Sequence, residues 1–291
     1  MSPVIAEPKI ETLPLEPVRE LMRACLHDTP LGRLLDDASP LLGQGKMLRS
    51  RLTLRVGPAV GTDPLTLRHA AASIEVIHAA SLLHDDVIDG GLLRRGKPSF
   101  WQTKGVAGAI LLGDTLLIKG LDLVARFEDG RLTGPLVRFA GEVCQAEAEQ
   151  ELIYRHRAAQ WADCERIARL KTGALFAFAG YAAAGTERLL QAALMEAGYE
   201  IGTAYQLADD LLDAVGDPNE LGKTLGTDSA RDKVTAASFL AAGHDPAAYV
   251  NHLCRSAHGR LAGWPAVQAA WDTYMQHDFI PALGGHLTIS F

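Results

Sequence analysis

Two aspartate clusters lie within long, largely apolar stretches of this chain. The first is His84-Asp85-Asp86-Val87-Ile88-Asp89 and the second is Asp209-Asp210-Leu211-Leu212-Asp213, so both contain the pattern DDxxD. In a helix, the first and last aspartates of this pattern are four residues apart and share a face. Neighbouring carboxylates repel one another unless a cation neutralises them. Two such clusters on apolar helices therefore predict opposing walls of a cleft that holds cations.

The spacing of apolar residues predicts helices in most of the remaining chain. In the segment 67–89, Ile74, His78, Ser81 and Asp85 recur at steps of three and four residues, and two glycines follow as a helix end. The segments 105–126, 136–157, 163–184 and 197–215 also favour helix. Alternation with period two is scarce, and no solenoid repeat or Ser/Gly-rich linker is found. We predict an all-α protein with one helical-bundle domain over residues 16–291 and a loosely ordered segment over residues 1–15.

Composition narrows the class of protein. Of the 291 residues, 48% are hydrophobic and 22% are charged, which is typical of a globular protein. The net charge is -7 and no block of Lys and Arg occurs, so a nucleic-acid partner is disfavoured. The longest uncharged stretch, residues 172–186, is shorter than the ~20 residues of a membrane span. The N-terminal residues lack the basic and apolar regions of a signal peptide, and we expect a cytoplasmic protein without a transmembrane segment.

The four cysteines are scattered, and no two form a Cys-x-x-Cys pair. This spacing fits neither a disulfide framework nor a zinc knuckle, so we expect free buried thiols. Carboxylate oxygens without nearby cysteine favour Mg²⁺ over zinc. Mg²⁺ is typically held by a few carboxylates, waters and substrate phosphates.

Several further motifs identify a family. The segment IHAASLLHDDVIDGGLLRRGKPS resembles the first aspartate-rich region of trans-prenyl diphosphate synthases, and YQLADDLLDAVGDPNELGKTLGTD resembles the second. GKMLRSRL is similar to the family pattern GKRLRP, and GDTLL, GEVCQ and KTGALF also match. The matches run in the family's order from residue 43 to about residue 235. The resemblance implies the isoprenoid synthase type of helical fold.

The resemblance also implies a reaction. Isopentenyl diphosphate would be condensed head to tail with an allylic diphosphate, with the help of Mg²⁺, to give an all-trans polyprenyl diphosphate and free diphosphate. Charge on the departing diphosphate would be neutralised by metal ions between the two clusters. Asp85, Asp89 and Asp209 are the first choices as direct ligands. Asp86, Asp210 and Asp213 would ligate metal or act through its waters.

The other site residues are inferred from their positions in the matched motifs. The resemblance places Lys46, Arg49, His78 and Arg95 at the isopentenyl diphosphate, and Arg94, Lys171, Lys223 and Lys233 at the allylic diphosphate. Lys171, Thr172 and Gln206 are the candidate catalytic residues, the last two through oxygen dipoles that stabilise the allylic cation. For any one cation, a solvated surface residue is the alternative, and for Thr172 and Gln206 it is a structural hydrogen bond.

Gly222-Lys223-Thr224 is similar to the end of a P-loop, but the glycine required five residues earlier is Asp217. We therefore exclude a P-loop. The resemblance implies instead that Lys223 reaches a diphosphate from a flexible lid.

Product length depends on the residues that precede the first motif. In the family, bulky residues four and five positions before the first aspartate close the product tunnel, and here these are the small Ser81 and Ala80. We expect a product of geranylgeranyl size or longer, unless Leu116, Ile118 or a residue of another helix closes the tunnel. Ser50 and Tyr205 depart from the family pattern, which has Pro and Phe there. The C-terminal part, from about residue 255, is the least similar.

Alternatives remain open at this stage. They are a farnesyl-length synthase, a class I terpene cyclase and a non-catalytic regulatory subunit of a heteromeric synthase. The second DDxxD argues against a cyclase, and two intact clusters argue against a regulatory subunit. The resemblance further implies a homodimer, which the sequence does not separate from a heteromer.

Overall fold

The computed structural model describes residues 12–27, 29–34, 38, 41–127, 130–155, 157–215 and 233–283, without the side chains of residues 214, 215 and 241. The expected lid residue Lys223, much of the expected N-terminal segment and the end of the C-terminal tail lie outside this range. Residues 12–15 lie within it, and the Leu13 amide donates a hydrogen bond to the Leu54 carbonyl at 3.2 Å.

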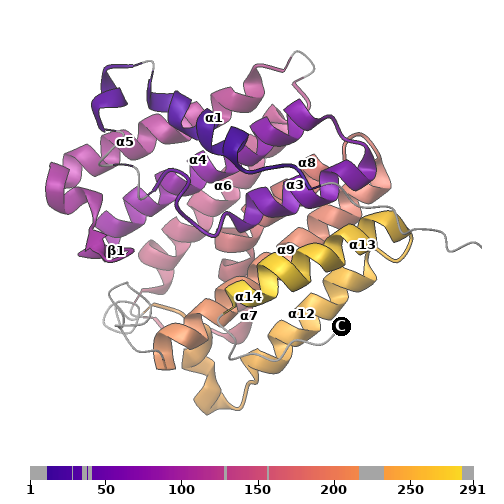
Figure 1. Cartoon of the computed structure of the whole chain (residues 1–291). Helices are drawn as coiled ribbons and strands as arrows, with labels where there is room; N and C mark the ends of the chain where they lie inside the picture. Colours follow the sequence, from indigo (N-terminus) through magenta and orange to yellow (C-terminus); the bar gives the residue numbers. More distant parts are fainter. Residues whose placement is uncertain are drawn as a thin grey trace, which may run out of the picture.

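The chain is all-α, as predicted (Figure 1). The α-helices are α1 (Glu16–His27), α3 (Leu48–Val60), α4 (Pro64–Ile88), α5 (Phe100–Ala125), α6 (Thr133–Glu149), α7 (Trp161–Ala168), α8 (Ala174–Ala183), α9 (Arg188–Val215), α12 (Pro246–Gly259), α13 (Pro265–Tyr274) and α14 (Ile280–Ala282). The shorter helical turns are η1 (Pro30–Leu34), η2 (Gln150–Tyr154), η3 (Arg169–Gly173), η4 (Ala236–Ala242) and η5 (Met275–Phe279). A two-residue antiparallel pairing of β1 (Leu93–Arg94) with β2 (Lys97–Pro98) is the only sheet among the described residues.

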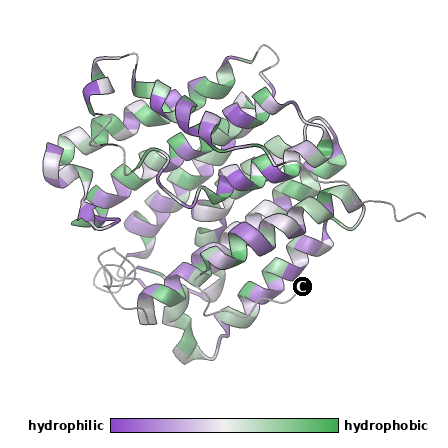
Figure 2. Ribbon diagram, viewed as in Figure 1, coloured by the Kyte–Doolittle hydropathy of each residue, from purple (hydrophilic) through white to green (hydrophobic). Residues whose placement is uncertain are grey.

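Helix α4 is the central element of the bundle. Pro64 begins it, and the Asp63 side chain accepts a hydrogen bond from the Thr66 amide, which caps its first turn. One side of α4 packs with α1 and α5, through residues such as Val76 and Leu83. Its other side packs toward α3 and α8, through residues such as Ile74. Most of the longer helices carry hydrophobic and hydrophilic residues together, as helices that bury one face do (Figure 2). Helix α8 differs, since all of its residues except Tyr181 are buried.

Helix α9 approaches α8 and η3 unusually closely, because glycines line the contact. A Cβ atom at Gly202 would lie 2.5 Å from the Cα atom of Gly173, and one at Gly198 would lie 2.4 Å from the Phe176 carbonyl oxygen. Both obstacles are backbone atoms, which do not rotate away. The glycines therefore let the two backbones meet, and this meeting sets the position of η3 beside the second aspartate cluster.

None of the helices, over the part of the chain that is described, combines the length and apolar character needed to cross a bilayer.

We predict that Gly202→Ala destabilises the protein, because the added methyl group meets backbone atoms of η3. The cost expected for overpacking is about 1–3 kcal/mol in the free energy of unfolding, measured by urea denaturation. Gly141→Ala in α6 is the matched control, since nothing lies within 4 Å of a Cβ atom there. That substitution should stabilise the helix by roughly 0.5–1 kcal/mol. Equal unfolding free energies for Gly202→Ala and the wild type would contradict the close packing.

Candidate active site

One cleft of about 770 Å³ gathers most of the residues singled out from the sequence. Its lining includes Lys46, Arg49, His78, Asp85, Asp86, Asp89, Arg94, Arg95, Lys171, Thr172, Gln206, Asp209, Asp213 and Lys233. These side chains come from α3 and the residues just before it, from α4 and its C-cap residue, from the β1–β2 hairpin, η3 and α9, and from the residues just before η4. Of the predicted site residues, Asp210 lines a smaller neighbouring cavity of about 30 Å³, and Lys223 lies outside the described residues.

The first aspartate cluster occupies the last turn of α4. Asp89 caps this helix, and its amide donates to the Asp85 carbonyl at 2.7 Å. The GDTLL motif of α5 explains how the turn is seated. A Cβ atom at Gly113 would lie 2.3 Å from His84 Nε2, so only glycine leaves room for the imidazole. His84 Nε2 also lies 3.3 Å from Asp114 Oδ1. The histidine that precedes Asp85 is therefore held between α4 and α5.

Asp86 forms an ion pair with Arg94. The Arg94 Nη2 and Nε atoms donate to Asp86 Oδ1 at 2.6 and 3.1 Å, and Asp86 is buried. This fork-like pair joins the end of α4 to the β1–β2 turn, so Arg94 is oriented within the cleft by an aspartate of the first cluster.

Two lysines lie against the carboxylates of the cleft. Lys233 reaches Asp89 Oδ1 with its Nζ atom at 2.5 Å, and it is 8% exposed. Lys171 forms an ion pair with Glu147 and donates to Gln150 Oε1 at 3.1 Å. Burial raises the pKa of the Asp85 carboxyl well above its usual range, and nearby Lys171 opposes that rise. Burial disfavours the Lys171 ammonium, but Asp85 and Glu147 outweigh burial and raise the pKa of Lys171.

Glu147 was missed by the sequence analysis. It lies on α6 four residues after Val143, and both residues line the cleft. Its Oε1 atom is buried and finds no hydrogen-bond partner among the residues the structure covers. The available signal was this helical spacing from the GEVCQ motif, which places Glu147 on the same face as Val143.

A chain of hydrogen bonds links η3 to α9. Thr172 Oγ1 donates to Gln206 Oε1 at 2.5 Å, and Gln206 Nε2 donates to Asp210 Oδ1 at 2.8 Å. Asp210 Oδ2 accepts from the Ala236 amide at 2.8 Å, and Asp210 is 7% exposed. The middle aspartate of the second cluster thus fixes the start of η4, whereas Asp209 and Asp213 line the main cleft.

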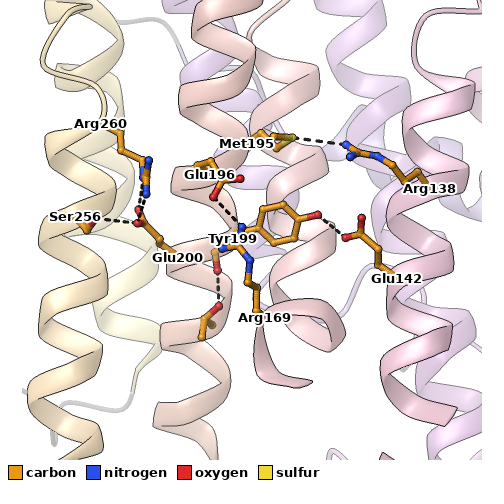
Figure 3. Close-up of polar contacts among 10 residues, drawn as sticks. Arg138, Glu142, Arg169, Met195, Glu196, Tyr199, Glu200, Ser256 and Arg260 are labelled. Carbon is orange, nitrogen blue, oxygen red and sulfur yellow. Dashed lines mark hydrogen bonds and ion pairs between the residues drawn. The ribbon is translucent and has the colours of Figure 1, made fainter. Parts of the chain in front are cut away.

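Lys171 and Thr172 lie on a single π-helical turn, η3, and such turns are frequent at functional sites. Figure 3 shows how this turn is anchored away from the cleft. Arg169 donates to Glu196 Oε2 at 2.8 Å, and its guanidinium lies 4.0 Å from the centre of the Tyr199 ring. The Tyr199 hydroxyl donates to Glu142 of the GEVCQ motif. This network joins α6, η3 and α9, so it holds the turn that presents Lys171.

The other end of the cleft is basic. The Arg49 guanidinium lies 4.8 Å from the centre of the Phe176 ring, and a Cβ atom at Gly45 would lie 2.8 Å from Arg95 Nη2. Lys46 Nζ donates to the Ala282 carbonyl at 2.6 Å, which ties this end to the C-terminal helices. Burial and the neighbouring arginines lower the pKa of His78 well below its usual value. His78 is therefore a neutral hydrogen-bonding group among cations.

A metal fits the carboxylate end only with additional ligands. No three His, Cys, Asp or Glu side chains within the described ranges converge closely enough to hold a metal ion alone. The donors on both walls are nevertheless carboxylate oxygens, which suit Mg²⁺. The residues present fit an ion that is completed by waters and by phosphate oxygens of a substrate.

Comparisons with known proteins agree with the fold and the motifs. Residues 34–258 match the model of the family described as polyprenyl synthetase. The chain belongs to the polyprenyl synthetase family. It is 33% identical over 214 residues to an octaprenyl diphosphate synthase of Haemophilus influenzae, covering 69% of this chain and 65% of that protein. It is 34% identical over 229 residues to a geranylgeranyl diphosphate synthase of Mycobacterium tuberculosis, covering 76% of this chain and 65% of that protein. The chain thus spans slightly less than two thirds of the length of these two relatives.

Solved structures support the same fold. A decaprenyl diphosphate synthase of Rhodobacter capsulatus superposes with a TM-score of 0.79 at 26% identity, covering 89% of this chain and 94% of that one. A polyprenyl synthase of Caulobacter crescentus, complexed with calcium and isoprenyl diphosphate, gives a TM-score of 0.70 at 28% identity. The alignment covers 91% of this chain and 85% of that chain.

The cysteine expectation needs one correction. Cys25, Cys164 and Cys254 are buried as expected, but Cys144 is exposed and lines the cleft. Cys144 follows Val143 on the cleft side of α6, where the wall opens to solvent.

We predict that Cys144 is the thiol that reacts with Ellman's reagent in the folded protein at pH 8. Burial raises the pKa of Cys25 to about 11 and that of Cys164 and Cys254 to about 12, so these thiols stay protonated and shielded. Burial also raises the pKa of Cys144, but its side chain is exposed and therefore accessible to the reagent. Inorganic pyrophosphate with Mg²⁺ should slow the reaction, because Cys144 lines the cleft. Fast labelling of a folded Cys144→Ser variant would contradict this assignment.

Proposed function

We propose that this chain is a trans-prenyl diphosphate synthase that condenses isopentenyl diphosphate with an allylic diphosphate in a Mg²⁺-dependent reaction. The observation that carries the proposal is that one cleft holds aspartates of both clusters at one end and a basic group of side chains at the other. The carboxylate end would take the allylic diphosphate, which is bound through metal ions. The basic end would take isopentenyl diphosphate, which is bound by positively charged side chains. The Caulobacter relative bound to calcium and isoprenyl diphosphate supports a divalent cation.

Asp85, Asp89 and Asp209 are proposed to hold the metal ions, with Asp213 on the same cleft wall as Asp209. Bound Mg²⁺ would neutralise charge on the diphosphate that leaves the allylic substrate. The pairing of Asp86 with Arg94 favours an orienting role for Asp86, and the inward bonds of Asp210 favour a structural one. Of the proposed metal residues, these two are thus the least suited to direct ligation.

The basic side chains act on the diphosphates directly. Lys233 pairs with Asp89, and Lys171 pairs with Glu147 and lies near Asp85, so both ammonium groups are within the reach of an allylic diphosphate held by metal at these aspartates. Arg49, His78 and Arg95 would hold isopentenyl diphosphate at the other end, where arginine forks suit phosphate oxygens. Thr172 and Gln206 line the cleft, and their side-chain oxygen atoms would stabilise the allylic cation.

We further propose a product of geranylgeranyl length or longer. Ser81 lines the cleft and presents only a small side chain at the level where a bulky residue would stop growth. Of the two deeper residues considered as a floor, Ile118 is 63% exposed and points away from the interior, whereas Leu116 is fully buried. Leu116 is therefore the better of the two candidates for a floor that would lie beyond the residues lining the cleft.

Product analysis tests this function directly. The purified protein is incubated with Mg²⁺, labelled isopentenyl diphosphate and, separately, dimethylallyl, geranyl or farnesyl diphosphate. Chromatography of the dephosphorylated products should show elongation that ends at one discrete length, of twenty carbons or more. A folded protein that elongates no primer would exclude a synthase acting alone and favour a regulatory subunit or a cyclase.

We predict that Asp85→Ala lowers turnover about a hundredfold or more, because a metal ligand that acts on the leaving group is lost. Asp122→Ala is the control, since Asp122 lies on α5 outside the cleft and pairs with Arg126 at 2.6 Å. Turnover of the control should match the wild type. Near-normal turnover in a folded Asp85→Ala protein would contradict the metal assignment.

We also propose that the active protein is a homodimer formed through α5. Val106, Ile110, Leu111 and Ile118 are exposed and recur at helical spacing along one side of this helix. A second copy of the chain, packed against this apolar stripe, would remove it from water.

Ile118→Glu should therefore convert a dimer into a monomer, because the interface would bury an unpaired charge. The molecular mass in solution, measured by light scattering, checks this. Leu189→Glu is the control, since Leu189 is 73% exposed on α9, away from the stripe. A wild-type protein that is monomeric at micromolar concentration would overturn the dimer proposal.

A further inference from the structure

Beside the basic end of the cleft lies a buried carboxylate that the proposed mechanism does not use. Glu75 is 6% exposed, lines the cleft and precedes His78 by three residues on α4. The backbone N–H of Ser50 donates to Glu75 Oε1 at 3.2 Å, and the Ser50 hydroxyl lies 3.1 Å from the same atom. Amides in the first turn of a helix have no acceptor within the helix. Glu75 Oε1 therefore supplies a hydrogen-bond acceptor for the first turn of α3, where the side chain of the N-cap residue Met47 supplies none.

Glu75 also lies within a group of cations. Its carboxylate attracts Arg49 and Arg95 and opposes the fall in their pKa values that burial causes. Burial in turn raises the pKa of Glu75, while Arg49 and Arg95 act against that rise. No hydrogen bond joins Glu75 to Arg49, and the buried Arg49 Nε atom has no partner within the described part of the chain. Glu75 therefore acts on Arg49 through its charge and does not fix the direction of the guanidinium.

We propose that Glu75 is the counter-ion of this basic end: its carboxylate balances Arg49 and Arg95 while the diphosphate is absent, and it thereby weakens the binding of anions there. The identity of the anion, isopentenyl diphosphate, rests on the proposed function. Uncompensated charges in a poorly solvated site raise the free energy of the empty protein. An anion that binds the site then stabilises the protein more, because it restores the balance.

Glu75→Gln separates charge from structure. The glutamine oxygen still accepts from Ser50 and the volume is nearly unchanged, so the negative charge is lost while an NH2 group replaces one carboxylate oxygen. The variant should have a lower Tm than the wild type without ligand. Inorganic pyrophosphate, added without metal, should raise its Tm more than that of the wild type. The KM for isopentenyl diphosphate should fall about three- to tenfold, while the KM for the allylic diphosphate stays unchanged.

Ser50→Ala is the matched control. It removes the hydroxyl next to Glu75 but keeps the carboxylate and the backbone N–H. Its Tm should also fall, but the increase in Tm caused by pyrophosphate should equal that of the wild type. A role of Glu75 in packing alone predicts that Glu75→Gln behaves like this control, and that result would overturn the proposal.

A raised KM for isopentenyl diphosphate in Glu75→Gln would also overturn the proposal, since it would mean that Glu75 positions the arginines. The Tm measurement needs no turnover. If the wild type elongates no primer while pyrophosphate still stabilises Glu75→Gln more strongly, the proposed function fails and the counter-ion role stands.

Discussion

The balance of charge across the cleft is the constraint on which the site depends. Carboxylates of α4 and α6 lie in a partly buried space, where each would be costly without a cation nearby. Lys233 forms an ion pair with Asp89, and Lys171 forms one with Glu147 and lies near Asp85. At the other end the signs are reversed, with the Glu75 carboxylate near the cations Arg49 and Arg95 and beside the neutral His78. In the empty site, the carboxylates and cations are already partly paired with one another. If the proposed function is right, metal ions then pair with the carboxylates and the diphosphates pair with the basic side chains.

The geometry behind this balance comes from backbone packing. Gly202 and Gly173 allow α9 to meet η3, and the network of Arg169, Glu196 and Tyr199 holds that turn from behind. As a result, the π-helical turn η3 places Lys171 near the first aspartate cluster and Thr172 against Gln206 of α9. The positions of the catalytic candidates are thus consequences of small residues and ion pairs outside the cleft.

The sequence predicted the helical class and the grouping of the site well, because both depend on local spacing and on motifs. The segments 67–89 and 197–215 form the greater part of α4 and α9, and the aspartates of each are brought to one cleft, apart from Asp210. What the sequence did not reveal depends on contacts between distant segments. Asp210 turns inward to the Ala236 amide, and Glu147 and Glu75 acquire their partners only when α6, α3 and η3 pack together. The roles of the individual site residues remain predictions.

The most direct test is the binding of Mg²⁺ with and without inorganic pyrophosphate, measured by calorimetry. Because no three carboxylates among the described residues converge on one point, and because lysines pair with Asp89 and Glu147, Mg²⁺ alone should bind weakly. Mg²⁺ and pyrophosphate together should bind much more tightly than either alone, and Asp85→Ala should abolish the difference. Tight binding of Mg²⁺ in the absence of pyrophosphate would contradict a metal site completed by the diphosphate.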